Sequence, residues 1–256
     1  AANRWWNGTD FPELTSCQPP YTETEAEIID SEARHRCQSL LSVDDSYVAI
    51  MAAVRDLDQE DTTYVLVSSD HGYNLGNHML QSAKMQFYDH SLRIPMVFKG
   101  PGITRNSELD FLGTQVDLAP TILGLAGIDT PQTMDGKSIV PLLVSEAAAA
   151  AQHEVVPGSV RQHLAATPPP PPRAASFHAY YNQGPWDVDA RHRLDDWSNT
   201  WIGLHFKSKG RDLKYGVFDP YGKQSNFSKP FMFALFDLQA DPYELRNVYN
   251  ETVASP

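Results

Sequence analysis

The feature that most constrains the fold is the run Thr63–Ser68, TYVLVS, which is apolar, favours β-structure and leads directly into the polar stretch 69–72, SDHG. The run lacks a strict alternation of apolar and polar residues, which indicates a strand buried on both faces. We therefore predict an interior strand of a parallel sheet. In open parallel sheets ligands bind beyond the carboxyl ends of the strands, so Asp70 and His71 are candidate site residues.

The neighbouring segments predict an α/β chain. Residues Thr22–Leu57 predict a long helix that opens with the capping-box pattern TETE and carries apolar residues at helical spacing. Met96–Lys99 predicts a second short strand, and Val116–Leu125 predicts an apolar helix that contains Pro120. Helices that alternate with strands are typical of the α/β class.

The second half of the chain has a different pattern. Residues 146–173 hold runs of alanine and proline, and this low-complexity stretch predicts a linker or inserted loop that does not pack as a core. Asp241-Pro242 predicts the start of a short terminal helix that continues through Tyr249. A small antiparallel sheet is predicted from the strand-like segments 177–181, 200–206, 213–218 and 231–236, with a hairpin between the middle two.

Composition excludes several classes of function. The net charge of -12 argues against a general binder of nucleic acid or of anionic membranes, because both bind preferentially to basic protein surfaces. No apolar run approaches the roughly 20 residues that a transmembrane helix needs. Cys17 and Cys37 permit one disulfide bridge, and two unrelated thiols are the alternative. Three glycosylation sequons are compatible with a secretory route; they begin at Asn7, Asn226 and Asn250.

The polar residues after the first predicted strand suit the binding of a cation and an anion together. The Asp70 carboxylate is a hard ligand for a divalent cation, and His71 can coordinate the same ion or donate a hydrogen bond to an oxyanion. Lys84, fourteen residues after Asp70, can return over the strand end and hold an anionic group. The alternatives are a turn-forming aspartate, a solvated lysine and, for His78, a hydrogen-bonded loop residue.

The combination of these residues resembles one family. The stretch 65–103, VLVSSDHGYNLGNHMLQSAKMQFYDHSLRIPMVFKGPGI, is similar to the sulfatase segment in which Ser-Asp-His/Asn-Gly is followed by a loop, a lysine, Arg/Lys-x-Pro and Gly-Pro-Gly. The resemblance continues in RCQSLLSVDDSYVAIMAAVRDL, in VDLAPTILGLAGIDTPQTMDGKSIVPLL and in LFDLQADPYELRNVYN. Within the family, the N-acetylglucosamine-6-sulfatase branch, which acts on sulfated glycosaminoglycans, is most similar.

The resemblance implies part of an alkaline-phosphatase-like, mostly parallel sheet flanked by helices, followed by a small antiparallel sheet with a terminal helix. It implies three parts: the C-terminal portion of a catalytic α/β domain (1–145), a linker or inserted loop (146–173) and a small α+β domain (174–256). The implied function is hydrolysis of sulfate esters of a sulfated sugar, a glycosaminoglycan or an aryl sulfate, on a secretory route to the lysosome or the exterior.

By the same resemblance, Asp70 and His71 match calcium ligands. Lys84 matches the catalytic lysine that contacts the sulfate ester, and His78 is a further candidate for substrate contact.

Other family features have no match. Sulfatases use a formylglycine made from a Cys/Ser-x-Pro/Ala-x-Arg motif, whereas CQPPY at Cys17 has Tyr21 in place of the arginine. We interpret Cys17 as a structural cysteine, with Cys37 as a possible bridge partner, and Asp44-Asp45 as solvated helix residues. The chain is then expected to be incomplete, inactive alone, and to expose an apolar face on the Thr22–Leu57 helix. The alternatives are a phosphonate or phosphodiester hydrolase of the same superfamily and an inactive glycan- or calcium-binding fragment.

Overall fold

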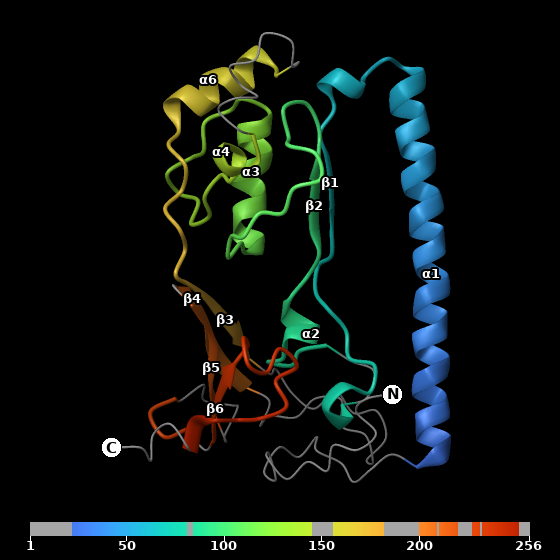
Figure 1. Cartoon of the computed structure of the whole chain (residues 1–256), viewed down its shortest axis with the longest axis vertical. Helices are drawn as coiled ribbons and strands as arrows, with labels where there is room; N and C mark the ends of the chain where they lie inside the picture. The colour runs from blue at the N-terminus through green and yellow to red at the C-terminus, as the bar shows by residue number, and fades with distance from the viewer. Residues whose placement is uncertain are drawn as a thin grey trace. The chain divides into compact units, whose positions relative to one another are not determined.

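A computed structural model describes residues 22–80, 84–144, 156–181, 200–208, 210–219, 227–230 and 232–250 (Figure 1). The chain divides into two compact units. Unit 1 comprises Ala1–Leu41, Ser69–Ile94 and Phe177–Pro256, and unit 2 comprises Ser42–Ser68 and Pro95–Ser176. Each unit therefore combines segments that are far apart in the sequence.

The first helix, α1, spans Glu23–Asp56 and confirms the predicted helix. Its capping box is formed, because the Thr22 hydroxyl accepts a hydrogen bond from the Glu25 N–H at 3.3 Å and Glu25 Oε2 accepts one from the Thr22 N–H at 2.8 Å. Although α1 is long, none of the helices in the described part of the chain is both long and apolar enough to cross a membrane.

The expected exposed apolar face of α1 is confirmed. Only two of its large apolar side chains are buried, Ile29 and Met51. The exposed ones are Ile28, Leu40, Leu41, Val43, Tyr47, Val48 and Ile50. An apolar face of this extent is unusual on a soluble surface.

The strand predicted before Asp70 is present as β1, Val65–Ser68, but its expected environment is wrong. β1 pairs antiparallel with β2, Met96–Lys99, with Val65 opposite Lys99 and Ser68 opposite Met96. Val67 and Val97 are 40% and 58% exposed. A continuous apolar run indicates a strand, but it does not encode the direction of the partner, so the sequence could not distinguish the two pairings.

The rest of unit 2 is helical. A 3-10 turn, η4, covers Gln115–Asp117 and leads into α3, Leu118–Leu125, which confirms the predicted helix around Pro120. In the described residues after α3, α4 spans Val140–Leu143 and α6 spans Gly158–Ala166. Their shared core consists of Leu125, Val140, Val144, Val156 and Val160, with Tyr64, Phe98, Ile103, Leu143 and Leu164 packed around it.

Helix α6 corrects the expectation that residues 146–173 do not pack. Val160 is fully buried, and Val156, just before the helix, belongs to the same core. The alanine and proline runs dominated the composition of the stretch and hid the short apolar pattern between them. The domain boundaries at 145 and 173 remain predictions, which limited proteolysis can test.

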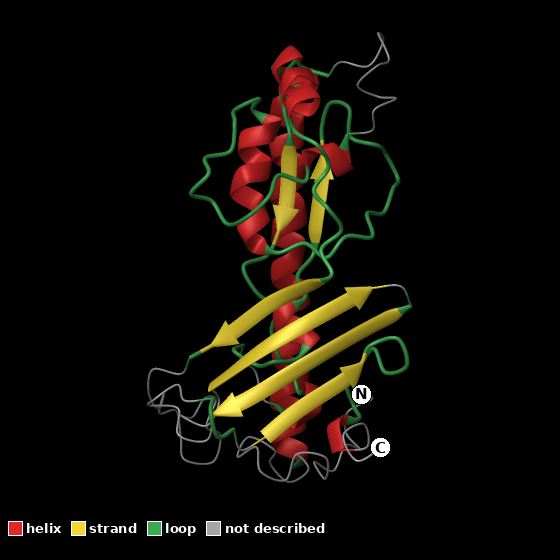
Figure 2. Ribbon diagram, turned by 90° about the vertical axis from the view of Figure 1, so that its left-hand side faces the viewer, coloured by secondary structure: helices red, strands yellow, loops and turns green. Residues whose placement is uncertain are grey.

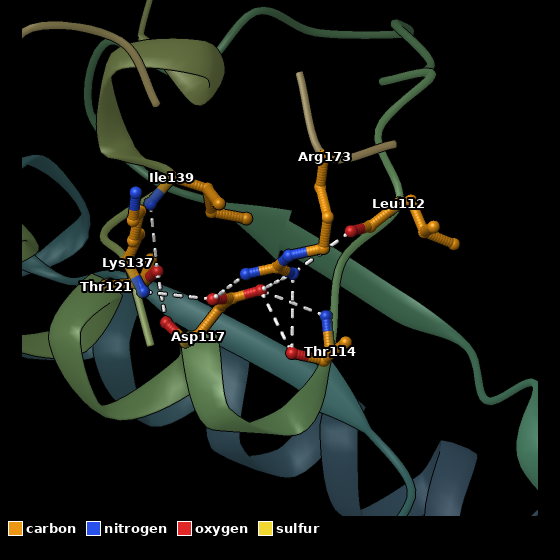
Figure 3. Close-up of polar contacts among 7 residues, drawn as sticks. All are labelled: Leu112, Thr114, Asp117, Thr121, Lys137, Ile139 and Arg173. Atoms are coloured by element: carbon orange, nitrogen blue, oxygen red, sulfur yellow. Dashed lines mark hydrogen bonds and ion pairs between the residues drawn. The ribbon is translucent and has the colours of Figure 1, made fainter. Parts of the chain in front are cut away.

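Asp117 organises the start of α3 (Figure 3). Its carboxylate, which is almost fully buried, accepts hydrogen bonds from the backbone N–H groups of Thr114 and Lys137, at 3.0 and 2.9 Å. Arg173 adds a two-pronged ion pair and also donates to the Leu112 carbonyl at 3.1 Å. Burial acts to raise the pKa of Asp117, but the hydrogen bonds from Arg173, Lys137 and Thr114 outweigh it, so the pKa is lowered.

Unit 1 is built on a four-stranded sheet in the order β3-β4-β5-β6 (Figure 2). The strands are β3 Ala175–Tyr180, β4 Thr200–Ser208, β5 Arg211–Asp219 and β6 Met232–Asp237. The antiparallel pairs β4–β5 and β5–β6 confirm the predicted sheet and its central hairpin. Its core contains Leu80, Phe87, Tyr88, Trp201, Phe218, Ala234 and Phe236.

The predicted helix at Asp241–Tyr249 is wrong. The chain instead turns, with the Glu244 N–H donating to the Asp241 carbonyl at 3.1 Å, and Glu244 takes a left-handed conformation with a φ of 56°. The reason is an ion pair, because Glu244 Oε1 lies 2.7 Å from the buried Lys214 ammonium. Such a tertiary contact overrides the local helix signal of Asp-Pro.

Candidate functional site

The structure brings three of the four predicted site residues together. Asp70 Oδ2 lies 3.1 Å from His71 Nε2, and Lys84 Nζ lies 2.7 Å from the same nitrogen. The Asp70 side chain is 80% exposed and the His71 side chain 33% exposed, so the group is open to solvent and to a ligand. The predicted convergence of the strand-end acid and the lysine fourteen residues later is present within unit 1.

The loop that carries Asp70 and His71 is held by backbone hydrogen bonds to the short helix α2, Asp89–Leu92. The N–H of Gly72 donates to the Ser91 carbonyl at 2.8 Å, and the N–H of Tyr73 donates to the His90 carbonyl at 2.9 Å. A Cβ at position 72 would collide with the His90 carbonyl oxygen. Glycine at this position is therefore required by the close approach of the two backbones.

Hydrogen bonding assigns the tautomer of His71. Its Nδ1 lies 2.7 Å from the Gly72 carbonyl oxygen, which can only accept, so Nδ1 carries the proton of the neutral ring. Nε2 then presents a lone pair. The Lys84 ammonium donates to that lone pair, and a metal cation could use it in the same way.

Asp70 and His71 fit one part of a cation site. A carboxylate oxygen and an imidazole lone pair 3.1 Å apart can act as adjacent ligands of one divalent ion. Calcium, however, takes about six to eight oxygen ligands. Among the described residues, no group of three or more His, Cys, Asp or Glu side chains could hold a metal. The pair is thus a partial ligand set.

His78 has a different environment. Its side chain is buried, its Nε2 hydrogen bonds to the Tyr243 carbonyl at 2.9 Å, and its ring stacks on Tyr88 with centroids 3.9 Å apart. Burial, assisted by the Lys214 charge, lowers the pKa of His78 to about 4. This position does not favour contact with a substrate, and the substrate-binding role of His78 stays a prediction.

The residues considered as substitutes for missing family features lie elsewhere. Asp44 and Asp45 are exposed on α1, as expected for solvated residues. Cys37 is a free, exposed thiol. Cys17 and Tyr21 lie outside the described residues.

The sequence did not predict a buried charge cluster below the site loop. Lys214 Nζ lies 2.8 Å from Asp89 Oδ1 and 2.7 Å from Glu244 Oε1, and its side chain is 1% exposed. One signal was present, because Lys214 shares its face of β5 with Gly216 and Phe218, which are inward-facing positions. A lysine on such a face predicts a buried partner.

Comparison with known proteins finds that the chain is similar to one family. A family model described as Sulfatase matches residues 4–128. The chain is 40% identical over 114 residues to the Extracellular sulfatase SULF-1 homolog of Drosophila melanogaster, covering 44% of this chain and 10% of the relative. It is 28% identical over 236 residues to the N-acetylglucosamine-6-sulfatase of Bos taurus, covering 92% of this chain and 40% of the relative. The chain thus spans two fifths or less of the length of these relatives.

The fold agrees with these matches. The solved structure of BT4656, in complex with its substrate D-glucosamine-2-N,6-O-disulfate, is similar with a TM-score of 0.61 and 22% identity. The similarity covers 84% of this chain and 36% of that chain. The predicted α/β fold is therefore confirmed, because it is similar to that of this solved structure. The family model, the relatives and the fold agree, and residues 4–128 of this chain match the sulfatase family.

Proposed function

We propose that the protein is a sulfuric ester hydrolase that acts on a sulfated sugar, and that this chain supplies the part that holds the ester. The observation that carries the proposal is the convergence of Asp70, His71 and Lys84. The names of two relatives, an extracellular sulfatase and an N-acetylglucosamine-6-sulfatase, and the bound disulfated glucosamine of BT4656 support a glycosaminoglycan sugar as substrate.

Each residue has a role set by its chemistry. The Lys84 ammonium is a compact cation that can donate hydrogen bonds to the oxygens of a sulfate ester. Asp70 and His71 would hold the cation, with Gly72 fixing the His71 ring through its carbonyl. Calcium, the metal that the family resemblance implies, would neutralise negative charge on the sulfate when bound.

Among the described residues, no cysteine or serine lies in the motif from which sulfatases make their nucleophile. The formylglycine of sulfatases requires a Cys/Ser-x-Pro/Ala-x-Arg motif. Cys37, on α1, is followed by Gln38-Ser39-Leu40-Leu41, which lacks both the proline or alanine and the arginine of that motif. We therefore expect this chain to bind the ester without turning it over.

Calorimetric titration with glucosamine-6-sulfate in the presence of calcium tests the proposal. Replacing Lys84 by Met should weaken binding by roughly tenfold or more, because a hydrogen bond to a charged group is lost. Asp70→Asn should reduce calcium affinity, measured separately with the metal alone. Lys229→Met, at an exposed position of unit 1, is the matched control and should bind like the wild type.

The ligand comparison separates the proposal from its alternatives. Tighter binding of a phosphonate monoester or phosphodiester than of the sulfate ester would favour a phosphonate or phosphodiester hydrolase. Equal affinity of Lys84→Met and the wild type would remove Lys84 from the site and overturn the proposal.

We further propose a secretory route. The sequon at Asn250, an exposed residue, and the name of the extracellular relative support it. In a eukaryotic secretory host, a glycosidase-sensitive mass that disappears in Asn250→Gln would support glycosylation there. An unmodified Asn250 in secreted protein would contradict glycosylation at this sequon.

A further inference from the structure

The residue after Lys84 is held in an unfavourable backbone conformation. Met85 has a φ of 86°, in the left-handed region that favours glycine. Residues other than glycine persist there only where the surroundings fix them, and such positions cluster at functional sites. Because φ of Met85 sets the direction of the chain on either side, it also sets where Lys84 points.

Two side chains from the sheet of unit 1 fix Met85. The indole Nε1 of Trp201, on β4, donates a hydrogen bond to the Met85 carbonyl at 3.2 Å. The hydroxyl of Tyr180, on β3, donates to the Met85 sulfur at 2.9 Å. Trp201 is 2% exposed, so its indole has little freedom to move away.

A second contact that fixes this segment is made by Phe87, whose ring packs on two glycines of the sheet. Gly203 and Gly216 are opposite each other on β4 and β5. A Cβ at Gly216 would lie 2.8 Å from Phe87 Cζ, and a Cβ at Gly203 would collide with the same ring. The ring also meets Trp201 edge-on, with centroids 5.3 Å apart. Because neither glycine has a side chain, the Phe87 ring can pack directly against the backbone of β4 and β5.

A third anchor lies beyond the ring. Lys214 Nζ is 4.8 Å from the centroid of Phe87 and pairs with Asp89, two residues further along. Residues of β3, β4 and β5 thus contact segment 85–89 at three places: Met85, the Phe87 ring and the Asp89 carboxylate.

We propose that Trp201 is a positioning residue for Lys84: its indole N–H holds Met85 in the left-handed conformation that directs the Lys84 ammonium to His71. The inference rests on the proposed function, in which Lys84 holds the ester. Trp201 itself is buried and touches no substrate. The sheet of unit 1 thereby sets the position of Lys84 by holding Met85, the next residue.

The test reads the Lys84–His71 contact directly, without substrate. In ¹⁵N-histidine-labelled chain, the His71 Nε2 resonance, assigned with His71→Asn, reports whether that nitrogen accepts a hydrogen bond. Lys84→Met gives the position of the resonance without the ammonium. Trp201→Phe, which keeps an aromatic ring but cannot donate, should move the resonance towards that of Lys84→Met while the variant still unfolds cooperatively.

Two further variants make the test decisive. Tyr180→Phe removes only the hydroxyl that meets the Met85 sulfur, and it should shift the resonance less and in the same direction. Tyr215→Phe is the matched control, because Tyr215 stacks on Phe233 on the other face of β5, and the resonance should stay in place. The inference is overturned if folded Trp201→Phe leaves the resonance unchanged, whatever Tyr180→Phe does, or if Tyr215→Phe moves it equally.

Failure of the proposed function would look different. A wild-type chain that does not bind glucosamine-6-sulfate would remove the proposed function, while the histidine resonances would still decide the role of Trp201. If the wild type binds, Trp201→Phe should weaken binding in the same direction as Lys84→Met and by a smaller factor.

Discussion

Arg173 holds Asp117 in a bidentate ion pair, with Nη1 2.5 Å from Oδ2 and Nη2 2.8 Å from Oδ1 (Figure 3). The arginine directly follows the proline run 168–172, and the aspartate is the last residue of η4, directly before α3. The Asp117 side chain is 3% exposed and that of Arg173 22%. The pair therefore fastens an extended segment to the core of unit 2 through a largely desolvated contact.

Replacing Arg173 should destabilise unit 2. Arg173→Ala leaves a buried carboxylate without its cation and is expected to cost about 3 kcal/mol of unfolding free energy. Arg173→Lys keeps the charge but loses the two-pronged geometry, so a cost of about 1–2 kcal/mol is expected. Urea denaturation measures both. Arg105→Ala, at an exposed position of the same unit, should change stability by less than about 0.5 kcal/mol, and an equal loss there would contradict a specific role for the pair.

Local signals predicted local features well. The capping pattern at Thr22 marked the start of α1, and the apolar run before Asp70 marked β1. The contacts that define the site and its support are not local. Arg173 and Asp117 are 56 residues apart, and Lys214 and Asp89 are 125 apart, so no window of sequence contains both partners.

The convergence of Asp70 and Lys84 was predictable for a different reason. The spacing is short enough for the loop to return to the strand end, although the parallel sheet from which the site was inferred is not what β1 forms, because β1 pairs antiparallel with β2. The opposite holds for Glu244, where Asp-Pro indicated a helix. The ion pair between Lys214 and Glu244 forms only when β5 and the C-terminal segment fold together, so the local sequence does not predict it.

Substitutions in the buried cluster of Lys214, Asp89 and Glu244 should lower the unfolding free energy by different amounts. Lys214→Met leaves Asp89 and Glu244 without their shared cation and should cost about 3–5 kcal/mol. Burial raises the pKa of Glu244, whereas at Asp89 the Lys214 charge outweighs the effect of burial and lowers the pKa. A neutral side chain at 244 is therefore better tolerated, and Glu244→Gln should cost only about 1 kcal/mol.

Urea denaturation followed by tryptophan fluorescence checks this order. Lys229→Met is the control, since Lys229 is exposed in the same unit, and its midpoint should match the wild type. A Glu244→Gln variant as unstable as Lys214→Met would show that Glu244 is needed as an anion.

Three histidines should make the chain less stable in acid: His78, which is buried, and His90 and His178, which are partly buried. Burial is the main reason that the pKa is lowered from 6.5 to about 4 for His78, to about 3 for His90 and to about 4 for His178. The unfolded chain therefore binds protons that the folded chain does not between pH 6.5 and about pH 4. Stability is full above pH 6.5 and falls as the pH decreases through this window, by up to about 1.4 kcal/mol per pH unit for each histidine.

Thermal unfolding across this pH range measures the effect. His90→Phe, which removes one of the three groups, should reduce the slope of stability against pH. His35→Gln changes an exposed histidine on α1 and should leave the slope unchanged. A flat profile between pH 6.5 and pH 4.5 in the wild type would contradict the prediction.

The exposed face of α1 allows a matched test with adjacent residues. Ile50 is 58% exposed, whereas Met51, the next residue, is 5% exposed. Glutamine is a good helix former, so Ile50→Gln should change the unfolding free energy by less than about 0.5 kcal/mol. Met51→Gln places an amide in the core and should cost roughly 2 kcal/mol or more.

The same pair of variants tests the exposed apolar surface itself. Because Ile50 contributes to that surface in the isolated chain, Ile50→Gln should lower the fluorescence of an apolar dye such as ANS bound to folded protein. Met51→Gln contributes little to the surface and should not lower the signal while the protein stays folded. If Ile50→Gln instead destabilised the chain as much as Met51→Gln, the side chain of Ile50 would be packed in solution and the apolar face of α1 would be covered.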